Sequence, residues 1–161
     1  MSEQVKSAMQ LAFEKAGIAP IPEVVPETKA KEETKESPQQ PALGYVDRAE
    51  QVINMLRSDP HYRNFTVSKI RNILAMVNDI YNDVFIQTEP TLTKDTLNKI
   101  QRLRIRLVYE CGREPIIRSF TDSGKLLDEI AKIGNQREKF IAFSRYMEAL
   151  VAYHRYYGGN D

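Results

Sequence analysis

Residues 66–84 read TVSKIRNILAMVNDIYNDV and carry one continuous apolar stripe. Large apolar side chains recur every three or four positions, the spacing that brings side chains to one face of an α-helix. The members of the stripe are Ile70, Ile73, Leu74, Val77, Ile80, Tyr81 and Val84. Thr66 precedes them, and a threonine hydroxyl is a good acceptor for the free N–H groups of a first helical turn. The stretch therefore predicts an amphipathic helix that begins after Thr66.

The same periodicity predicts further helices on both sides of this one. From residue 44 onward there are three prolines, Pro60, Pro90 and Pro115, and each stands where one apolar pattern stops and another starts. The expected helices cover about 46–57, 66–84, 93–111, 126–133 and 136–157, with Gly112 and Gly134 ending the third and fourth. No stretch shows sustained period-two alternation, which argues against a sheet. The predicted fold class is all-α, a compact bundle of about five helices.

Two of these helices complete the expected core. The inward face of the first is predicted to be Val46, Ala49, Val52, Ile53 and Leu56. That of the third is predicted to be Leu97, Ile100, Leu103, Leu107 and Val108. Arg104 is expected to point nearer the core than its neighbours and to need a partner there.

The first 43 residues have a different composition. Residues 18–43 hold five of the eight prolines among Glu, Lys, Thr and Gln, which predicts a disordered linker. Ahead of it, residues 1–17 place Val5, Ala8, Met9, Ala12, Phe13 and Ala16 on one side of a short helix. A docking helix for a partner and a frayed extension both remain open, because a helix this short is marginal alone. Residues 44–161 form the predicted folded domain.

Charge and cysteine content limit the class of protein. The 23 Lys and Arg against 22 Asp and Glu give a net charge of +1, which excludes a histone-like protein that wraps a polyanion. Residues 1–43 carry five lysines and seven acidic residues, a net charge of −2, so residues 44–161 carry +3. The single cysteine, the absence of a signal-peptide pattern and the charges that interrupt residues 140–157 predict a soluble, cytoplasmic protein without contact with the membrane.

No pattern of catalytic or metal-binding residues is recognisable. With two histidines and one cysteine, Cys111, a closed zinc site lacks ligands at any recognisable spacing, so neither a metal nor a cofactor is expected. Gly-rich phosphate loops and nucleophile elbows are also missing from the sequence. His154 lies in an apolar stripe and is expected to be a hydrogen-bonded structural residue, whereas His61 is expected to be solvated.

Basic side chains form the remaining candidate site. Lys69 and Arg71 lie in the first turns of the 66–84 helix, where they, the Thr66 hydroxyl and the free backbone N–H groups suit a phosphate oxygen. Asn78 extends the Arg71 side. The other candidates are Arg102, Arg106 and Tyr109 on the solvent face of the third helix, and Arg113 and Arg118 beside the next joint. Charged helix faces are most often only solvated, so phosphate binding and simple solvation both remain open.

The last helix is apolar on two sides. One face carries Phe140, Phe143, Met147, Leu150, His154 and Tyr157. Much of the opposite face is apolar or small, through Ile141, Ala149, Ala152 and Tyr156. Such a helix is either central in the bundle or shared with another molecule.

Three blocks of sequence carry a family resemblance. They are TVSKIRNIL followed by VN and IY within residues 66–81, LRIRLVYECGRE at 103–114, and RYMEALVAYHRYY at 145–157. In this order they resemble the small helical subunit of type III-A CRISPR effector complexes, the Csm small subunit. The second block is similar to the family's segment ending in YEAGRE, with Cys111 replacing the small residue, and the third contains the EALVAY signature. Residues 1–43 match nothing in that pattern.

The resemblance implies a non-catalytic subunit that stacks with copies of itself beside the backbone and large subunits, which would carry the cleavage activities. It also implies contact with guide RNA and target RNA. The predicted RNA-binding residues are then Thr66, Ser68, Lys69, Arg71, Asn78, Arg102, Arg106, Arg113 and Arg118. The predicted subunit interface is Ile141, Arg145, Ala149, Ala152 and Tyr156. The alternatives are a helical protein-interaction module without RNA contact and a small nuclease whose acid–base pair is not recognisable.

Overall fold

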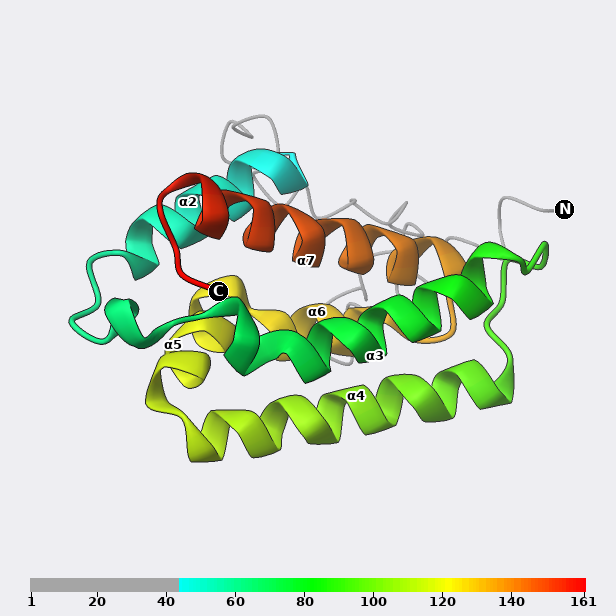
Figure 1. Cartoon of the computed structure of the whole chain (residues 1–161). Coiled ribbons are helices and arrows are strands. Elements are labelled where there is room, and N and C mark those ends of the chain that lie inside the picture. The colour runs from blue at the N-terminus through cyan, green and yellow to red at the C-terminus, as the bar shows by residue number, and fades with distance from the viewer. Residues whose placement is uncertain (1–43) are drawn as a thin grey trace, which may run out of the picture. The chain divides into compact units, whose positions relative to one another are not determined.

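The computed structural model describes residues 44–161, so the predicted short helix at 1–17 and linker at 18–43 lie outside the described residues (Figure 1). The described part folds into six α-helices and one 3-10 turn. They are α2 (Tyr45–Leu56), η1 (Tyr62–Asn64), α3 (Val67–Phe85), α4 (Lys94–Arg113), α5 (Pro115–Gly124), α6 (Leu126–Ile133) and α7 (Arg137–Tyr156). The all-α prediction is confirmed.

Threonine caps start helices α3 and α4. The Thr66 hydroxyl accepts a hydrogen bond from the Lys69 N–H at 3.3 Å, and α3 begins at the next residue. The Thr93 hydroxyl accepts one from the Thr96 N–H at 3.2 Å at the start of α4. Each cap supplies an acceptor to a first turn that otherwise lacks one, as the sequence predicts.

Helix α4 ends at a different residue from the one predicted. It continues through Gly112 to Arg113, so the prediction that Gly112 terminates it is wrong. Glu114 is extended, with φ −125° and ψ 108°, because Pro115 sterically disfavours a helical conformation at the preceding residue. Pro115 then opens α5, where its missing N–H costs nothing. Helix α5 is absent from the predicted set of about five helices, because its ten residues begin at Pro115 in a stretch whose sequence predicts a joint.

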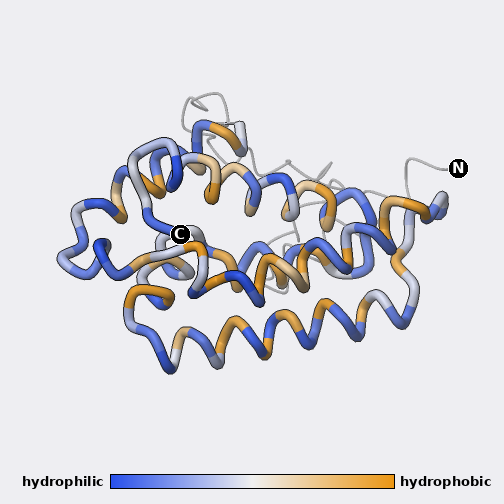
Figure 2. The backbone as a smooth tube through the Cα atoms, in the orientation of Figure 1, coloured by the Kyte–Doolittle hydropathy of each residue, from blue (hydrophilic) through white to orange (hydrophobic). Residues whose placement is uncertain are grey.

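Helix α7 holds the bundle together. It packs against α2, α3 and α6, whereas α4 lies on the other side of α3 (Figure 1). Its buried face is Phe140, Phe143, Tyr146, Met147, Leu150 and His154, close to the predicted stripe. Hydrophobic and hydrophilic residues alternate along the helices in Figure 2, as expected for helices that bury one side.

Three predicted inward side chains are exposed instead. Val46 and Val108 are 42% and 51% exposed, and Arg104 is also on the surface. Val46 precedes Ala49, the first buried residue of α2. Helix α4 packs on its neighbours with one narrow face, which buries Leu103 but leaves the flanking positions of its wide apolar pattern in solvent. Arg106, rather than Arg104, is the half-buried arginine of this helix.

The C-terminal residues return to the start of α3. Residues 44–161 contain no strand, but an isolated bridge pairs Thr66 with Asn160. The Val67 N–H donates to the Asn160 carbonyl at 3.3 Å, and the Gly159 N–H donates to the His154 carbonyl at 2.8 Å. No helix in this part of the chain combines the length and hydrophobicity needed to span a bilayer.

Leu150→Ala is expected to lower the free energy of unfolding by about 2–5 kcal/mol, because it removes transfer free energy and leaves a cavity. Leu150 is fully buried, at 0% exposure. Ile105→Ala is the matched control, since Ile105 is 69% exposed and its truncation should change stability by no more than about 0.5 kcal/mol. Urea denaturation followed by circular dichroism measures both, and equal losses would contradict the central position of α7.

Candidate nucleic-acid interface

Three arginines and a tyrosine form a stripe along the outer side of α4. Arg102, Arg106, Tyr109 and Arg113 follow one another at intervals of four, three and four residues, which keeps them on one face of the helix. The stripe is about 17 Å long at 1.5 Å per residue. Tyr109 and two of the arginines, Arg102 and Arg113, are exposed. The structure therefore brings three of the predicted RNA-binding residues together.

A buried carboxylate orients this stripe. Glu110 is only 2% exposed, and its Oε1 lies 2.7 Å from Arg106 Nη2. Arg113 Nε lies 3.7 Å from Oε2 of the same carboxylate. Removing Arg106 would leave a buried carboxylate poorly compensated, which typically costs about 3–5 kcal/mol. Arg106 is therefore part of the fold as well as of the stripe, and Arg102 and Arg113 are the freer cations.

Aromatic and apolar groups lie between the charges. The Arg106 guanidinium carbon is 5.4 Å from the centre of the Tyr109 ring, a cation–π distance. Beside them a shallow cavity of about 390 Å³ is lined by Met76, Arg102, Ile105, Arg106 and Tyr109. A surface with guanidinium forks, a tyrosine face and apolar side chains can contact phosphates, sugars and bases.

The start of α3 is already occupied by the protein itself. Lys69 Nζ donates to Glu114 Oε2 at 2.8 Å, and this hydrogen bond is the main reason that the pKa of Glu114 is lowered. Arg71 bonds the Ser68 hydroxyl at 3.3 Å. Since the Val67 N–H also has the Asn160 carbonyl as a partner, a phosphate would have to replace these contacts. Neither Glu114 nor the Asn160 carbonyl is marked as such a competitor by any pattern in the sequence.

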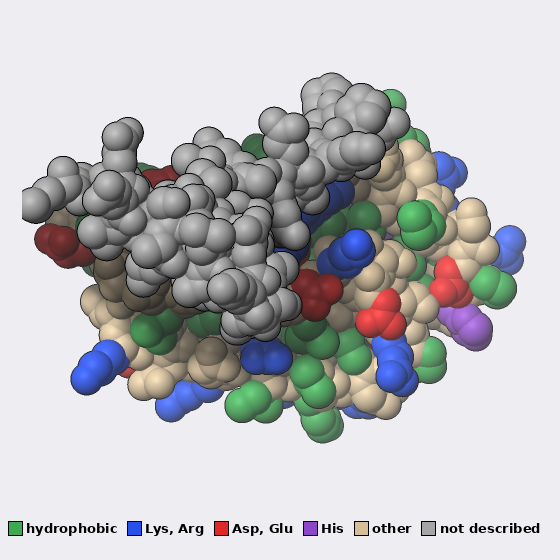
Figure 3. All heavy atoms as spheres, turned by 180° about the vertical axis from the view of Figure 1, so that it is seen from behind, with side chains coloured by type: hydrophobic (Ala, Val, Ile, Leu, Met, Phe, Trp, Pro, Cys, Tyr) green, Lys and Arg blue, Asp and Glu red, His purple; other side chains and the backbone are tan. Residues whose placement is uncertain are grey.

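The remaining predicted RNA-binding residues lie on other helices than the stripe. Asn78 lines a groove between α3 and α7, and Arg118 is exposed on α5. On the face shown in Figure 3, Lys and Arg side chains are scattered among hydrophobic and acidic ones. The α4 stripe is the set that the structure places in a row, and Lys69 lies beside its C-terminal end through the contact with Glu114.

The predicted interface residues share the outer side of α7. Arg145, Ala152 and Tyr156 are exposed, whereas Ile141 and Ala149 are half-buried against the core. Ile141 and Ala149 are half-buried because α2, α3 and α6 pack against the other sides of α7. None of residues 44–161 covers the exposed part of this face.

No clustered metal ligands accompany these surfaces. Among residues 44–161, no group of three or more His, Cys, Asp or Glu side chains lies close enough to hold a metal ion. The Cys111 thiol lies 3.2 Å from the Thr121 hydroxyl, and burial is the main cause that raises the pKa of Cys111. A raised pKa keeps this thiol protonated and poorly nucleophilic.

Comparison with known proteins identifies the family. The family described as Csm2 type III-A matches residues 39–160. The protein is 35% identical over 117 residues to the CRISPR system Cms protein Csm2 of Mycobacterium tuberculosis, covering 73% of this chain and 94% of the relative. The chain belongs to the Csm2 family. The Csm2 of Streptococcus thermophilus is 34% identical over 119 residues, and that of Enterococcus italicus 35% over 103 residues, covering 93% and 73% of those proteins.

Membership of the Csm2 family confirms the resemblance seen in the sequence blocks. It makes the chain the small subunit of a type III-A CRISPR effector complex, part of an antiviral defence system. The match includes every helix described here, and residues 1–38 lie outside it.

His154 joins the C-terminal residues of this Csm2 protein to the bundle. Its Nδ1 lies 2.8 Å from the Tyr62 hydroxyl, and its Nε2 lies 3.4 Å from the Asn160 carbonyl oxygen. Because that carbonyl only accepts, Nε2 carries the proton and Nδ1 accepts from Tyr62. A side chain on Gly159 would place Cβ 2.2 Å from the His154 ring, so the close approach requires glycine. The predicted structural role of His154 is confirmed.

Acidification is expected to destabilise the protein through His154. Burial is the main cause that lowers the pKa of His154 below 6.5. As the pH falls, this histidine therefore binds its proton at a higher pH in the unfolded chain than in the folded protein. The stability that His154 contributes is then fully present above pH 6.5 and falls by up to about 1.4 kcal/mol per pH unit as the pH drops below 6.5. Urea denaturation across this range measures the slope. His154→Gln should flatten it and His61→Gln should preserve it; a slope that survives His154→Gln would assign the effect to other groups.

Proposed function

We propose that this subunit is a non-catalytic RNA-binding component that contacts the backbone of guide RNA and target RNA without reading sequence. It stacks with copies of itself beside the backbone and large subunits of the effector complex, which carry the cleavage reactions. The observation that carries the RNA-binding proposal is the row of Arg102, Arg106 and Arg113 on one face of α4.

Arginine suits such a task for geometric reasons. Its planar guanidinium donates two parallel hydrogen bonds to a phosphate and remains charged at every physiological pH. Three such groups spread over about 17 Å match an extended backbone better than a single anion. Glu110 holds the central one in place at 2.7 Å, so less side-chain freedom is lost on binding.

The chemistry of the stripe supports a non-catalytic role. It presents arginines and a tyrosine, whereas hydrolysis of RNA calls for a general base, a nucleophile or a metal ion. Base pairing between guide and target supplies the sequence specificity of RNA-guided complexes, so a subunit that must accept any guide needs phosphate contacts only. Self-stacking is supported separately by the exposed Arg145, Ala152 and Tyr156 on α7.

The double variant Arg102→Ala and Arg113→Ala is expected to weaken RNA retention by the assembled complex and to leave the fold intact. Each lost phosphate contact should reduce the salt dependence of binding to a single strand, lowering the slope of log K against log salt by about 0.7. Filter binding of two unrelated RNAs at several salt concentrations measures both quantities. The two RNAs should lose affinity equally.

Arg104→Ala is the matched control, because Arg104 is an exposed arginine on another side of the same helix. It should leave the slope unchanged. Unaltered RNA retention in the double variant would favour an interaction module without RNA contact. A loss confined to one RNA sequence would contradict backbone recognition.

A further inference from the structure

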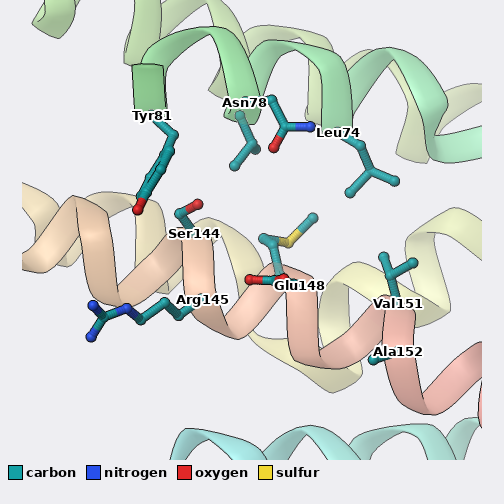
Figure 4. A pocket seen from close by; sticks show the side chains of 10 residues that line it. Leu74, Asn78, Tyr81, Ser144, Arg145, Glu148, Val151 and Ala152 are labelled. Carbon is teal, nitrogen blue, oxygen red and sulfur yellow. The ribbon is translucent and has the colours of Figure 1, made fainter. Parts of the chain in front are cut away.

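A groove between α3 and α7 has no occupant among the described residues. Figure 4 shows Leu74, Asn78 and Tyr81 on α3 facing the α7 side chains across it. The cavity measures about 650 Å³. Leu74, Tyr81 and Val151 are half-buried, so their inner parts pack on the core and their outer parts line the groove. The floor is apolar and long enough to take several side chains of a helical segment.

The rim of the groove carries two charges without partners. Arg145 and Glu148 are exposed, and neither forms an ion pair within residues 44–161. They are three residues apart on α7 and present opposite signs to whatever enters. An incoming segment with a basic side chain beside its apolar face would pair with Glu148.

The sequence of this chain contains such a segment. Residues 1–17 place Val5, Met9 and Phe13 at intervals of four residues, and on a helix Lys6 and Lys15 fall at the two edges of that apolar face. Intervals of four put the three side chains on one face of a helix, the pattern of anchors that bind an apolar groove. A segment this short gains stable helical structure only against a surface. The Csm2 family match begins at residue 39, so this segment is an addition to what the family shares.

We propose that residues 1–17 of one copy bind the α3/α7 groove of a neighbouring copy, an inference that rests on the proposed self-association. The groove opens onto the face where copies are expected to meet, since Arg145 and Ala152 belong to both. Residues 1–17 themselves hold two Lys and two Glu, a net charge of zero, so the contact would rest on the apolar side chains, while the −2 of residues 18–43 is opposite in sign to the +3 of residues 44–161.

The linker is long enough for this exchange. Residues 18–43 number 26, and a flexible chain of that length has a root-mean-square span of about 28 Å. A domain of the size of residues 44–161 has a radius of gyration of about 13–14 Å. The span is therefore comparable to the size of one domain, and once two copies are stacked the tether would hold the segment near the neighbour's groove at millimolar effective concentration.

Photo-crosslinking tests the contact directly. The photoreactive analogue p-benzoyl-phenylalanine replaces Phe13 in the full chain, and this protein is mixed with an equal amount of ¹⁵N-labelled full-length protein. Mass spectrometry should find crosslinks to peptides of α3 and α7 that line the groove, a large share of them joining chains of different isotope content. Crosslinks confined to single chains, or to other surfaces, would overturn the proposal.

Matched variants separate this proposal from self-stacking itself. Phe13→Ser should raise the dissociation constant of self-association at least tenfold in sedimentation equilibrium of the full chain, whereas Leu11→Ser, off the apolar stripe, should not. In the groove, Ala152→Glu should have the same effect as Phe13→Ser, and Ala131→Glu, on the exposed side of α6, should not.

The variants distinguish failure of the N-terminal contact from failure of the proposed self-stacking. If Ala152→Glu weakens self-association and Phe13→Ser does not, copies stack without the N-terminal segment and the inference is wrong while the proposed function stands. If copies do not associate even in the assembled complex, proposed stacking and this inference both fail. RNA retention should be normal in Phe13→Ser, because the α4 stripe lies on a different helix.

Discussion

Burial of one face of α7 is the constraint on which the rest of the molecule depends. Phe140, Phe143, Met147 and Leu150 are almost completely removed from solvent, and α2, α3 and α6 supply the surfaces that cover them. His154 continues the same face and fixes the C-terminal residues over the start of α3 through the Asn160 carbonyl. With α7 in the centre, α4 is left at the edge of the bundle, packed on one side only. An edge helix can present a long polar stripe without disturbing the core.

This arrangement explains why the two candidate surfaces are separate. The outer side of α4 carries the arginine stripe, and the outer side of α7, beside the α3/α7 groove, carries the proposed contact with a second copy. Helix α3 lies between them and packs on both. A subunit built this way can hold RNA along one helix while neighbours meet along another, so stacking need not compete with RNA for the same residues. The buried Glu110 adds rigidity to the stripe at the cost of making Arg106 structurally indispensable.

Much of the fold follows from local rules, and the departures have physical causes. Thr66 and Thr93 predicted two helix starts correctly, because a cap depends on a few adjacent residues. The prediction that α4 ends at Gly112 was wrong, because the steric effect of Pro115 on the preceding residue determines where the helix ends. For the candidate site, the sequence supplied the arginines of α4 but not their partner Glu110, which periodicity marks only as another position near the core. It also could not show that the C-terminal residues fill the start of α3, since that contact joins residues more than ninety positions apart.

Crosslinking of RNA to the assembled complex tests most directly the claim that the arginine stripe of α4 contacts RNA. A target RNA carrying 4-thiouridine at successive positions would be paired with its guide, irradiated, and the modified peptides of this subunit identified by mass spectrometry. The account predicts crosslinks concentrated in the second half of α4, around Tyr109, recurring with target RNAs of unrelated sequence. Crosslinks confined to residues 66–71 at the start of α3, or none on this subunit at any position, would contradict it.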